Sequence, residues 1–175
     1  MREEAPTATP SDEPRLLADA MLGALARWLR ALGYDAAYDA GLSDHALARL
    51  ARAEGRVLLT RDRELTRRRN LRVLFIASQE WPAQLRQVRR ELPLPAPAPF
   101  TRCLACNAPL EPLTRSEAWG LIPPYIFVTH NQFRLCPACN QVFWRGSHWQ
   151  RMEATLAGLG LLDPERSNSQ PCEVI

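Results

Sequence analysis

The sequence predicts an α/β fold, in which a compact parallel sheet with flanking helices is followed by a small cysteine-containing domain. Three observations predict it. Short apolar runs alternate with helical patterns over residues 15–92, an order that is typical of a parallel sheet. The segment PLPAPAP at 93–99 interrupts this order, because alternating prolines favour an extended spacer and cannot continue a helix. Two CxxC pairs and several aromatic residues follow it.

Each element of the first half is assigned from its apolar spacing and from residues that begin or end a helix. Leucines and alanines recur at helical spacing before Gly33, which is a natural residue to end a helix. Ser43 or Asp44 can cap the second helix, which Gly55 ends, and Pro93 closes the last helix. In chain order we predict a strand at 15–18, a helix at 21–32, a strand at 35–38, a helix from Ser43 to Gly55, a strand at 57–60, a short arginine-rich helix, a strand at 72–76 and a helix at 80–91.

The elements of the second half are assigned around its two CxxC pairs. The long interval between the pairs is expected to hold a β-hairpin with strands at 125–129 and 133–135. A strand at 142–144 follows the second pair. Ser147 and Gln150 then fit the capping-box pattern at the start of a helix.

Composition sets the expected boundaries of the chain. We expect a disordered leader at 1–14, the sheet domain at 15–92, a linker at 93–100, the cysteine domain at 101–160 and a disordered tail at 161–175. No apolar run approaches the ~18 residues of a transmembrane helix, and the acidic leader lacks the apolar core of a signal peptide. We therefore expect a cytoplasmic protein without a membrane partner. Cys172, alone in the tail, is expected to be a free thiol without function.

Four aspartates are predicted to lie at one edge of the parallel sheet. Asp19, Asp39 and Asp62 follow the first three predicted strands, and Asp44 begins the second helix. Residues that follow parallel strands gather along one edge. Two carboxylates ~5 Å apart repel by about 3 kcal/mol at an effective dielectric near 20, so a cluster requires a counter-charge. Mg²⁺ or Mn²⁺ supplies it through oxygen ligands, and such ions can promote phosphodiester hydrolysis.

The same aspartates have a purely structural interpretation. Asp after a strand is a common turn residue or helix cap, and Asp44 is especially open to that role because a regular helix follows it. The two roles can coexist, since a capping carboxylate keeps free lone pairs. Asp19 is the strongest metal candidate, because an unpaired charge between an apolar strand and an apolar helix is unfavourable.

The positive charge of the chain is carried by arginine alone, without lysine, and the net charge is +3. A general bias toward arginine explains the total but not the local density at 61–72. Such a block is a solvated face or a phosphate-binding patch. The candidate phosphate contacts are Arg27 and Arg30, which can share a helix face, together with Arg61 and Arg63.

The four paired cysteines have the spacing of two metal-binding turns, and the ligands are Cys103, Cys106, Cys136 and Cys139. Two such turns complete a tetrahedron of thiolates around Zn²⁺ at ~2.3 Å. Asn107 and Asn140 follow the two pairs, and Asn tolerates the left-handed conformation that these turns need. A redox dithiol is the alternative, but two pairs favour a structural zinc ion.

Aromatic and basic residues are concentrated after the second CxxC pair. Trp144, Arg145 and His148 are candidates for contact with nucleic acid, because exposed aromatic rings stack on bases and guanidinium groups pair with phosphates. If they are buried, the same residues simply pack the cysteine domain against its neighbour.

These motifs together resemble a known family. The stretches RLLADAMLGALARWLRALGYDAAYD, LLTRDREL and CPACNQVFWRGSHWQRM are similar to the Mut-seven C-terminal RNase domain, a PIN-like ribonuclease domain paired with a four-cysteine zinc ribbon. The resemblance runs from about Arg15 to Met152, and its α/β part is shorter than a full PIN domain. It implies a PIN-like nuclease unit followed by a zinc ribbon. It also implies Asp19, Asp44 and Asp62 as metal-binding catalytic acids, with weaker support for Asp39.

Three hypotheses of function follow from these motifs and the resemblance. The first is a divalent-metal-dependent ribonuclease that uses Mg²⁺ or Mn²⁺ for catalysis and Zn²⁺ for structure. The second is an RNA-binding module without catalysis, and the third is a toxin-type ribonuclease. RNA is the expected partner in each, and we expect a monomer or a weak dimer.

Overall fold

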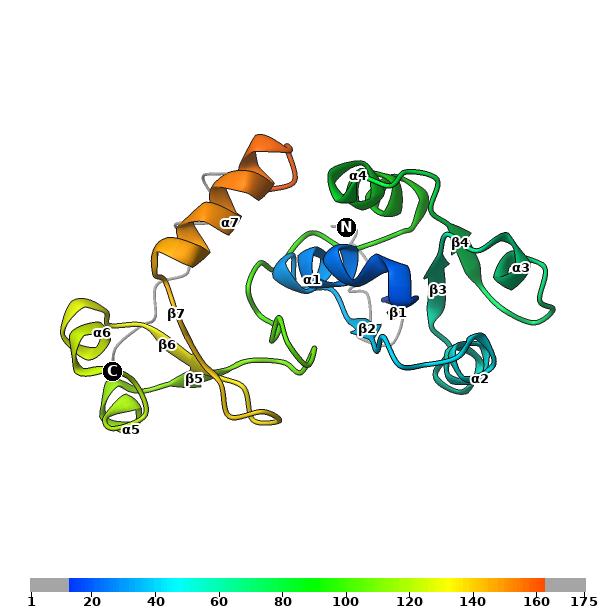
Figure 1. The fold of residues 1–175 in the computed structure, drawn as a ribbon. Coiled ribbons are helices and arrows are strands. Elements are labelled where there is room, and N and C mark those ends of the chain that lie inside the picture. The colour runs from blue at the N-terminus through cyan, green and yellow to red at the C-terminus, as the bar shows by residue number, and fades with distance from the viewer. Residues whose placement is uncertain (1–12, 163–175) are drawn as a thin grey trace, which may run out of the picture.

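The structure is a computed structural model that describes residues 13–162. Most of the predicted leader and tail, including Cys172, lies outside the described residues. The described chain forms a four-stranded parallel sheet flanked by helices and a second, three-stranded antiparallel sheet (Figure 1). This arrangement confirms the predicted α/β fold with a small second sheet beside the cysteines.

The parallel sheet has the strand order β2-β1-β3-β4. Every residue of the two inner strands is buried, because helices cover both faces of the sheet, and such strands are apolar throughout. Leu17 and Leu58 point into the core on one face, whereas Leu16, Ala18 and Leu59 point into the core on the other. The strands are β1 (Leu16–Ala18), β2 (Ala36–Tyr38), β3 (Val57–Thr60) and β4 (Val73–Phe75).

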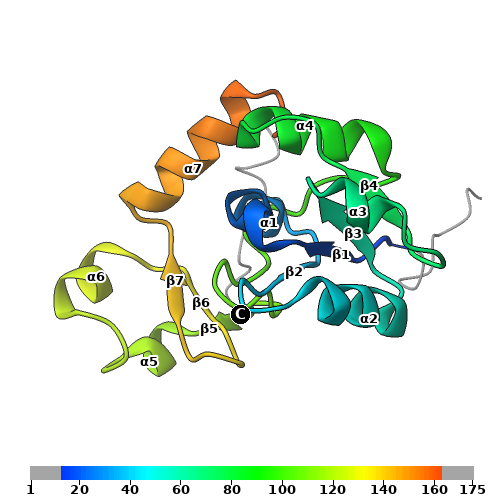
Figure 2. The ribbon, with the colours of Figure 1, turned by 45° about the vertical axis from the view of Figure 1, so that its right-hand side comes forward.

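Two pairs of helices cover the two faces of this sheet. Helices α1 (Gly23–Ala31) and α4 (Trp81–Glu91) lie together on one face, where Trp28 stacks on Trp81 at 4.3 Å between ring centroids. Helices α2 (Asp44–Glu54) and α3 (Arg63–Thr66) supply the core of the opposite face. Figure 2 shows α4 above the strands and α2 below them.

Helix ends in the first half agree with the predicted caps. The Ser43 hydroxyl accepts a hydrogen bond from the Ala46 amide, and Gly55 ends α2 in the left-handed conformation. The predicted first helix is divided, since a 3₁₀ turn η1 (Ala20–Leu22) precedes α1. The backbone therefore tightens directly after Asp19, which caps this turn.

The second half differs from the predicted hairpin. Residues 125–129 do not form a strand but lie in helix α6 (Pro124–Thr129), because two prolines precede them and proline at the first helical position favours a helix. The strand that pairs with β6 (Phe133–Leu135) is instead β5 (Glu111–Leu113). Strand β7 (Val142–Trp144) completes the antiparallel sheet, as predicted.

The predicted capping box at Ser147 and Gln150 is wrong. Helix α7 (Ser147–Gly158) begins at Ser147 itself, and its N-cap is Gly146, whose carbonyl accepts the Gln150 amide. A capping box does occur in the short helix α5 (Arg115–Ala118), where Thr114 and Glu117 exchange hydrogen bonds. This box was not among the predicted helix caps.

The linker and α7 join the two halves into one packed unit. The Ala98 and Phe100 amides donate hydrogen bonds to the carbonyls of Leu32 and Ala31 at the end of α1. Residues Met152 and Leu156 of α7 are buried in the same core as α1 and α4. Leu161 and Leu162, assigned to the disordered tail by sequence, are also buried in this core, so the packed chain extends further than predicted.

Among residues 13–162, no helix combines the length and the apolar character that crossing a membrane requires.

Candidate functional site

Parallel strand topology brings three of the four predicted acids to the same edge of the sheet. Asp19 directly follows β1, Asp39 directly follows β2, and Asp62 lies just past β3. Asp44 begins α2 after the loop that leaves this edge. Because β1 pairs with both β2 and β3, Asp19 is at the centre of this acidic edge.

Asp19 is buried, with only 4% of its surface exposed. Its Oδ1 accepts a hydrogen bond from the Met21 amide at 2.9 Å. Its Oδ2 accepts one from the Thr60 hydroxyl and one from the Arg61 amide at 3.2 Å. Neutral donors thus fix both oxygens of Asp19, and no described residue forms an ion pair with it.

Thr60 is a site residue that sequence analysis missed. It ends β3, is completely buried, and donates its hydroxyl hydrogen to Asp19. The same oxygen accepts the Asp62 amide at 2.9 Å. One hydroxyl therefore ties two acids of the edge together. The available signal was a hydroxyl residue at the end of an otherwise apolar strand, two positions before Asp62.

Asp62 and Asp39 are held by local turns, as the structural interpretation predicts, whereas the cap that it offered for Asp44 is supplied by Ser43. Asp62 Oδ1 caps α3 by accepting the Glu64 amide at 2.7 Å. Asp39 Oδ1 accepts the Gly41 amide at 2.9 Å and is exposed. Asp44 is exposed in the first turn of α2, where the helix dipole favours an acid.

The described aspartates do not form a group of three or more ligands ready to surround an ion; within residues 13–162 that arrangement belongs to four cysteines. None of the four aspartates is paired with an arginine in the described chain. Mg²⁺ keeps several water ligands and is commonly held by one or two carboxylates plus substrate phosphates. The acidic edge fits that mode of binding better than a closed cage.

The arginines that were predicted to contact phosphate differ in how exposed they are. Arg63 is exposed above the Phe75 ring, and Arg61 is half-buried beside Asp19. Arg27 on α1 is exposed and donates to His148 Nε2 on α7 at 3.0 Å, so these two candidates contact each other.

Arg30 is not a surface residue, which corrects the prediction that it shares a face with Arg27. It is 4% exposed, and its Nε donates to the Ala36 carbonyl at 2.8 Å. Its Nη1 donates to the carbonyls of Leu104 and Ala105, inside the first CxxC turn. We therefore remove Arg30 from the candidate phosphate contacts, because its guanidinium group joins the two halves.

The aromatic and basic residues after the second CxxC pair are partly packed. Trp144 lies against the core formed by Leu113 and Phe133, and it is half-buried. Arg145 pairs with Glu153 at 3.3 Å and remains 40% exposed. Neighbouring side chains thus cover part of the Trp144 ring, whereas the Arg145 side chain remains accessible to solvent.

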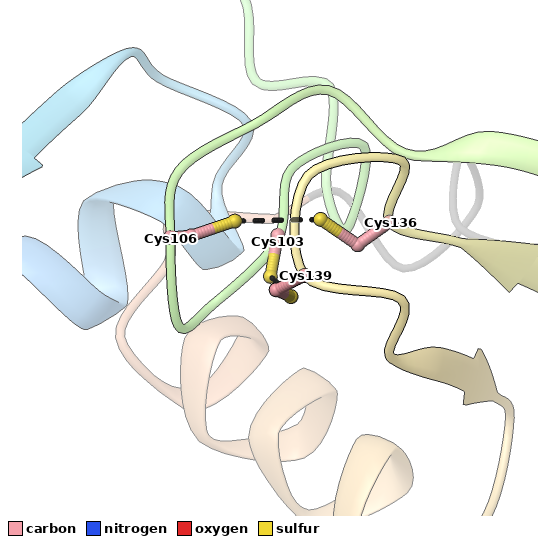
Figure 3. A group of neighbouring side chains, drawn as sticks. All are labelled: Cys103, Cys106, Cys136 and Cys139. Atoms are coloured by element: carbon pink, nitrogen blue, oxygen red, sulfur yellow. Dashed lines mark hydrogen bonds between the residues drawn. The ribbon is translucent and has the colours of Figure 1, made fainter.

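The four cysteines form a compact cluster between two loops (Figure 3). All four Sγ atoms lie within 4.8 Å of one another. Cys103 Sγ is 3.6 Å from Cys139 Sγ, and Cys106 Sγ is 3.3 Å from Cys136 Sγ. These separations exceed the ~2.05 Å of a disulfide and approach the ~3.8 Å edge of a tetrahedron with 2.3 Å Zn–S bonds. The cluster can therefore hold a metal ion.

The two turns that present the cysteines have matching backbone hydrogen bonds. The Asn107 amide donates to the Cys103 carbonyl, and the Asn140 amide donates to the Cys136 carbonyl. Both asparagines have positive φ, at 72° and 57°, as the sequence predicts. This duplicated turn is what places two thiols of each pair toward a common centre.

The surroundings of Cys103 and Cys136 shift the pKa values of their thiols in opposite directions. Burial raises the pKa of the Cys103 thiol to about 12. Burial also opposes ionisation of Cys136, but hydrogen bonds from the Cys139 backbone and from neighbouring thiols lower its pKa to about 7. The Arg30 guanidinium lies against the turn of Cys103 and Cys106, where it adds positive charge beside the thiols.

Asn107 also docks the first turn onto the parallel sheet. Its Oδ1 accepts the Ala36 amide of β2 at 3.0 Å, and its Nδ2 donates to Asp35 at 2.7 Å. Asp35 in turn forms an ion pair with Arg56 at 2.6 Å. The cysteine cluster is thus connected through specific polar contacts to the strand that precedes Asp39.

Comparison with known proteins gives one finding. The family model described as Mut7-C RNAse domain matches residues 14–156. No curated protein and no solved structure matches the chain.

Proposed function

Because this chain belongs to the Mut7-C RNAse domain family, we propose that it is a divalent-metal-dependent ribonuclease that hydrolyses RNA phosphodiesters. The observation that carries the proposal is the buried Asp19 carboxylate at the acidic edge, which has no cationic partner among the described residues. A buried carboxylate that is held only by neutral hydrogen-bond donors is a favourable place for a cation, and buried acids of this kind are common at functional sites.

The residues at the acidic edge fit Mg²⁺ or Mn²⁺, since carboxylate oxygens are the ligands these ions prefer. Asp19 and Asp62 would hold the ion directly, because Thr60 keeps both in place. Asp39 and Asp44 are exposed and would act through water. When bound, such an ion polarises the phosphodiester and makes water a stronger nucleophile.

The protein's own side chains would attract and orient the RNA. Arg61 and Arg63 flank Asp62 in the chain and would create positive potential where the substrate phosphates approach, whereas Arg72 directly precedes β4 at the opposite edge of the sheet. Asp19, held by three donors, needs no rearrangement when the substrate arrives. RNA affinity at this edge should therefore fall steeply as salt rises.

Zn²⁺ is the proposed metal of the four-cysteine cluster. Four thiolates fit this ion and complete its coordination, so the cluster has no open position for substrate or water. Its proposed contribution is to the stability of the second half of the chain, on the order of 10 kcal/mol.

The decisive experiment compares Asp19→Asn with the unmodified protein. With labelled single-stranded RNA and Mg²⁺ or Mn²⁺, we expect the variant to cleave about a hundredfold more slowly or worse, because a metal ligand is lost. RNA binding should stay within about twofold, since the phosphate-contacting arginines are unchanged. Electrophoresis of the products and fluorescence anisotropy measure the two effects.

The matched control is Glu111→Gln, which removes one exposed carboxylate from β5 and should leave cleavage unchanged. Full activity in Asp19→Asn, or cleavage that is independent of divalent ions, would contradict the proposal.

A second candidate is an RNA-binding module without catalysis. It is favoured by the lack of a three-carboxylate ligand group among the described residues. Under this candidate the unmodified protein would bind RNA but leave it intact with either ion.

A further inference from the structure

A cavity of about 960 Å³ lies between the antiparallel sheet, the linker and α7, in a part of the molecule other than the acidic edge. Its volume is at the upper end of the ~300–1,000 Å³ that is usual for small-molecule sites. Linker residues 96–101 form one wall, and β6 and β7 contribute another. The loop after α7 lines the cavity near Leu161.

The sheet face toward this cavity combines one cation with apolar neighbours. Arg134 is at the centre of β6 and is paired across the sheet with Pro112 of β5 and Phe143 of β7. Residues paired in this way share one face of a sheet. The residues on either side of Arg134 point to the other face, where Phe133 packs against α5 and α6.

The charge of the cavity is positive. Three arginines line it, Arg89, Arg134 and Arg145, against a single acid, Glu153. Arg145 pairs with Glu153, and Arg89 donates to the Leu161 carbonyl. The Arg134 side chain forms no hydrogen bond or ion pair with any residue in the described chain, and the residue is half-buried. A half-buried guanidinium group without a partner among the described side chains is available to bind an anion.

The apolar walls can accept a flat ring. Pro97, Pro99, Pro112 and Phe143 line the cavity, and the stacked pair Phe100 and Trp149 supports it, with 4.0 Å between the ring centroids. An anion joined to a flat heteroaromatic ring is the chemistry of a nucleotide, and aromatic side chains present flat surfaces on which the faces of bases stack.

We propose that this cavity binds an unpaired nucleotide of single-stranded RNA, with its phosphate on Arg134 and its base against the apolar walls. The inference rests on the proposed function in taking RNA as the ligand, and it adds a binding site away from the acidic edge. Single-stranded RNA is favoured over a duplex, because only an unstacked base can enter a concave site. It is favoured over an acidic peptide, because the family is named for RNase domains and the site pairs cations with ring-sized apolar walls.

The test measures binding of a fluorescein-labelled oligouridylate of about ten nucleotides by the full chain, without added Mg²⁺ or Mn²⁺. We expect Arg134→Ala to weaken binding about tenfold and to reduce the slope of log Kd against log salt by about 0.7, the value for one phosphate contact on a single strand. Arg134→Lys should restore the slope, because it keeps the charge. A structural role of Arg134 would not produce this recovery.

The control is Arg90→Ala, which removes the same charge from a side chain that is 71% exposed and does not line the cavity. It should change binding by less than about twofold. Equal effects of the Arg134 and Arg90 variants would overturn the proposal, and so would tighter binding of an acidic peptide than of RNA.

A second measurement does not depend on variants. Oligonucleotides that contain 4-thiouridine should crosslink to peptides from 96–101, 132–134 or 143–149 in the unmodified protein. Crosslinks confined to the arginine-rich segment 61–72 would overturn the proposal. Failure of the proposed function is separate: a protein that never cleaves RNA, yet binds it through Arg134, contradicts the nuclease and supports the cavity.

Discussion

At the scale of single residues, capping and metal binding by the aspartates do not exclude each other. Asp62 caps α3 through Oδ1, and its Oδ2 makes no hydrogen bond with a described residue. Asp19 has both oxygens fixed, but a carboxylate offers about four lone-pair sites and uses three here. Each acid therefore keeps acceptor capacity for an ion or for its water ligands.

Asp35 has the opposite role, since its charge is satisfied within the protein. Burial raises the pKa of its carboxyl group, but hydrogen bonds from Arg56 and Asn107 outweigh burial and hold the pKa below its ordinary value. Stability from such an acid is present above its unfolded pKa of about 3.9 and is lost as pH falls through the lower folded pKa. The loss therefore occurs below about pH 4.

We predict that Asp35→Asn lowers the free energy of unfolding at pH 7 by about 3 kcal/mol, because Arg56 loses a buried ionic partner and keeps Glu54 as its one described ion pair. The difference from the unmodified protein should shrink below about pH 4. Urea denaturation across pH measures it. The control is Glu91→Gln, which removes an exposed ion pair with Arg90 and should have no resolvable effect. A pH-independent difference for Asp35→Asn would contradict this account.

At the scale of elements, the end of α1 shows how one backbone conformation positions the linker. Gly33 has φ +91°, and a Cβ atom there would lie 2.1 Å from the Ala98 carbonyl oxygen. The linker reaches this position because its amides donate to the last carbonyls of α1, which lack partners within the helix. Position 33 requires glycine for two reasons: the backbone has a positive φ, and a Cβ atom would clash with the linker.

We predict that Gly33→Ala lowers the free energy of unfolding by more than about 2 kcal/mol, since a strained backbone and a backbone clash add. Gly55→Ala shares the left-handed strain but meets no atom within 4 Å, and should cost about 1 kcal/mol. Gly158→Ala, in the open last turn of α7, should be neutral or stabilise by up to about 1 kcal/mol. If the two variants lost the same free energy of unfolding, the linker would move away from the new Cβ atom at no energetic cost, and the prediction would be wrong.

At the scale of the whole molecule, the cysteine cluster and the parallel sheet form one connected structure. Arg30 joins α1 to the first CxxC turn, and Asn107 joins that turn to β2. Helix α7 then returns from the antiparallel sheet to pack on the α1–α4 core. Metal binding to the cysteine cluster should therefore affect β2 and, through it, the acidic edge, because Asp39 directly follows β2.

We predict that removing the metal with a chelator speeds amide hydrogen exchange in β2 as well as in the cysteine turns, because the Ala36 amide loses its partner on Asn107. With metal bound, Asn107→Gly should reproduce faster exchange at Ala36. Its matched control is Asn140→Gly, at the equivalent left-handed position of the second turn, which does not contact β2. Unchanged exchange in β2 after metal removal would contradict the coupling.

The sequence by itself determined the features that depend on local physics. Apolar runs and their periods specified the strands of the parallel sheet and most helices, and Gly55 was explicit as a helix end. The start of α2 was left between Ser43 and Asp44. The cysteine spacing with Asn107 and Asn140 specified a metal-binding turn. The alternation of strand and helix was sufficient to place Asp19, Asp39 and Asp62 at one edge.

Only the tertiary structure decided which side chains met, because contacts between distant segments depend on packing that no local pattern records. It buried Arg30 against the first CxxC turn, joined Thr60 to two acids, and paired β6 with 111–113 after prolines directed 124–129 into a helix. It also placed Arg134 in a cavity whose walls come from the linker and α7. Periodicity shows that a residue faces inward, whereas its neighbours are set by the arrangement of the elements.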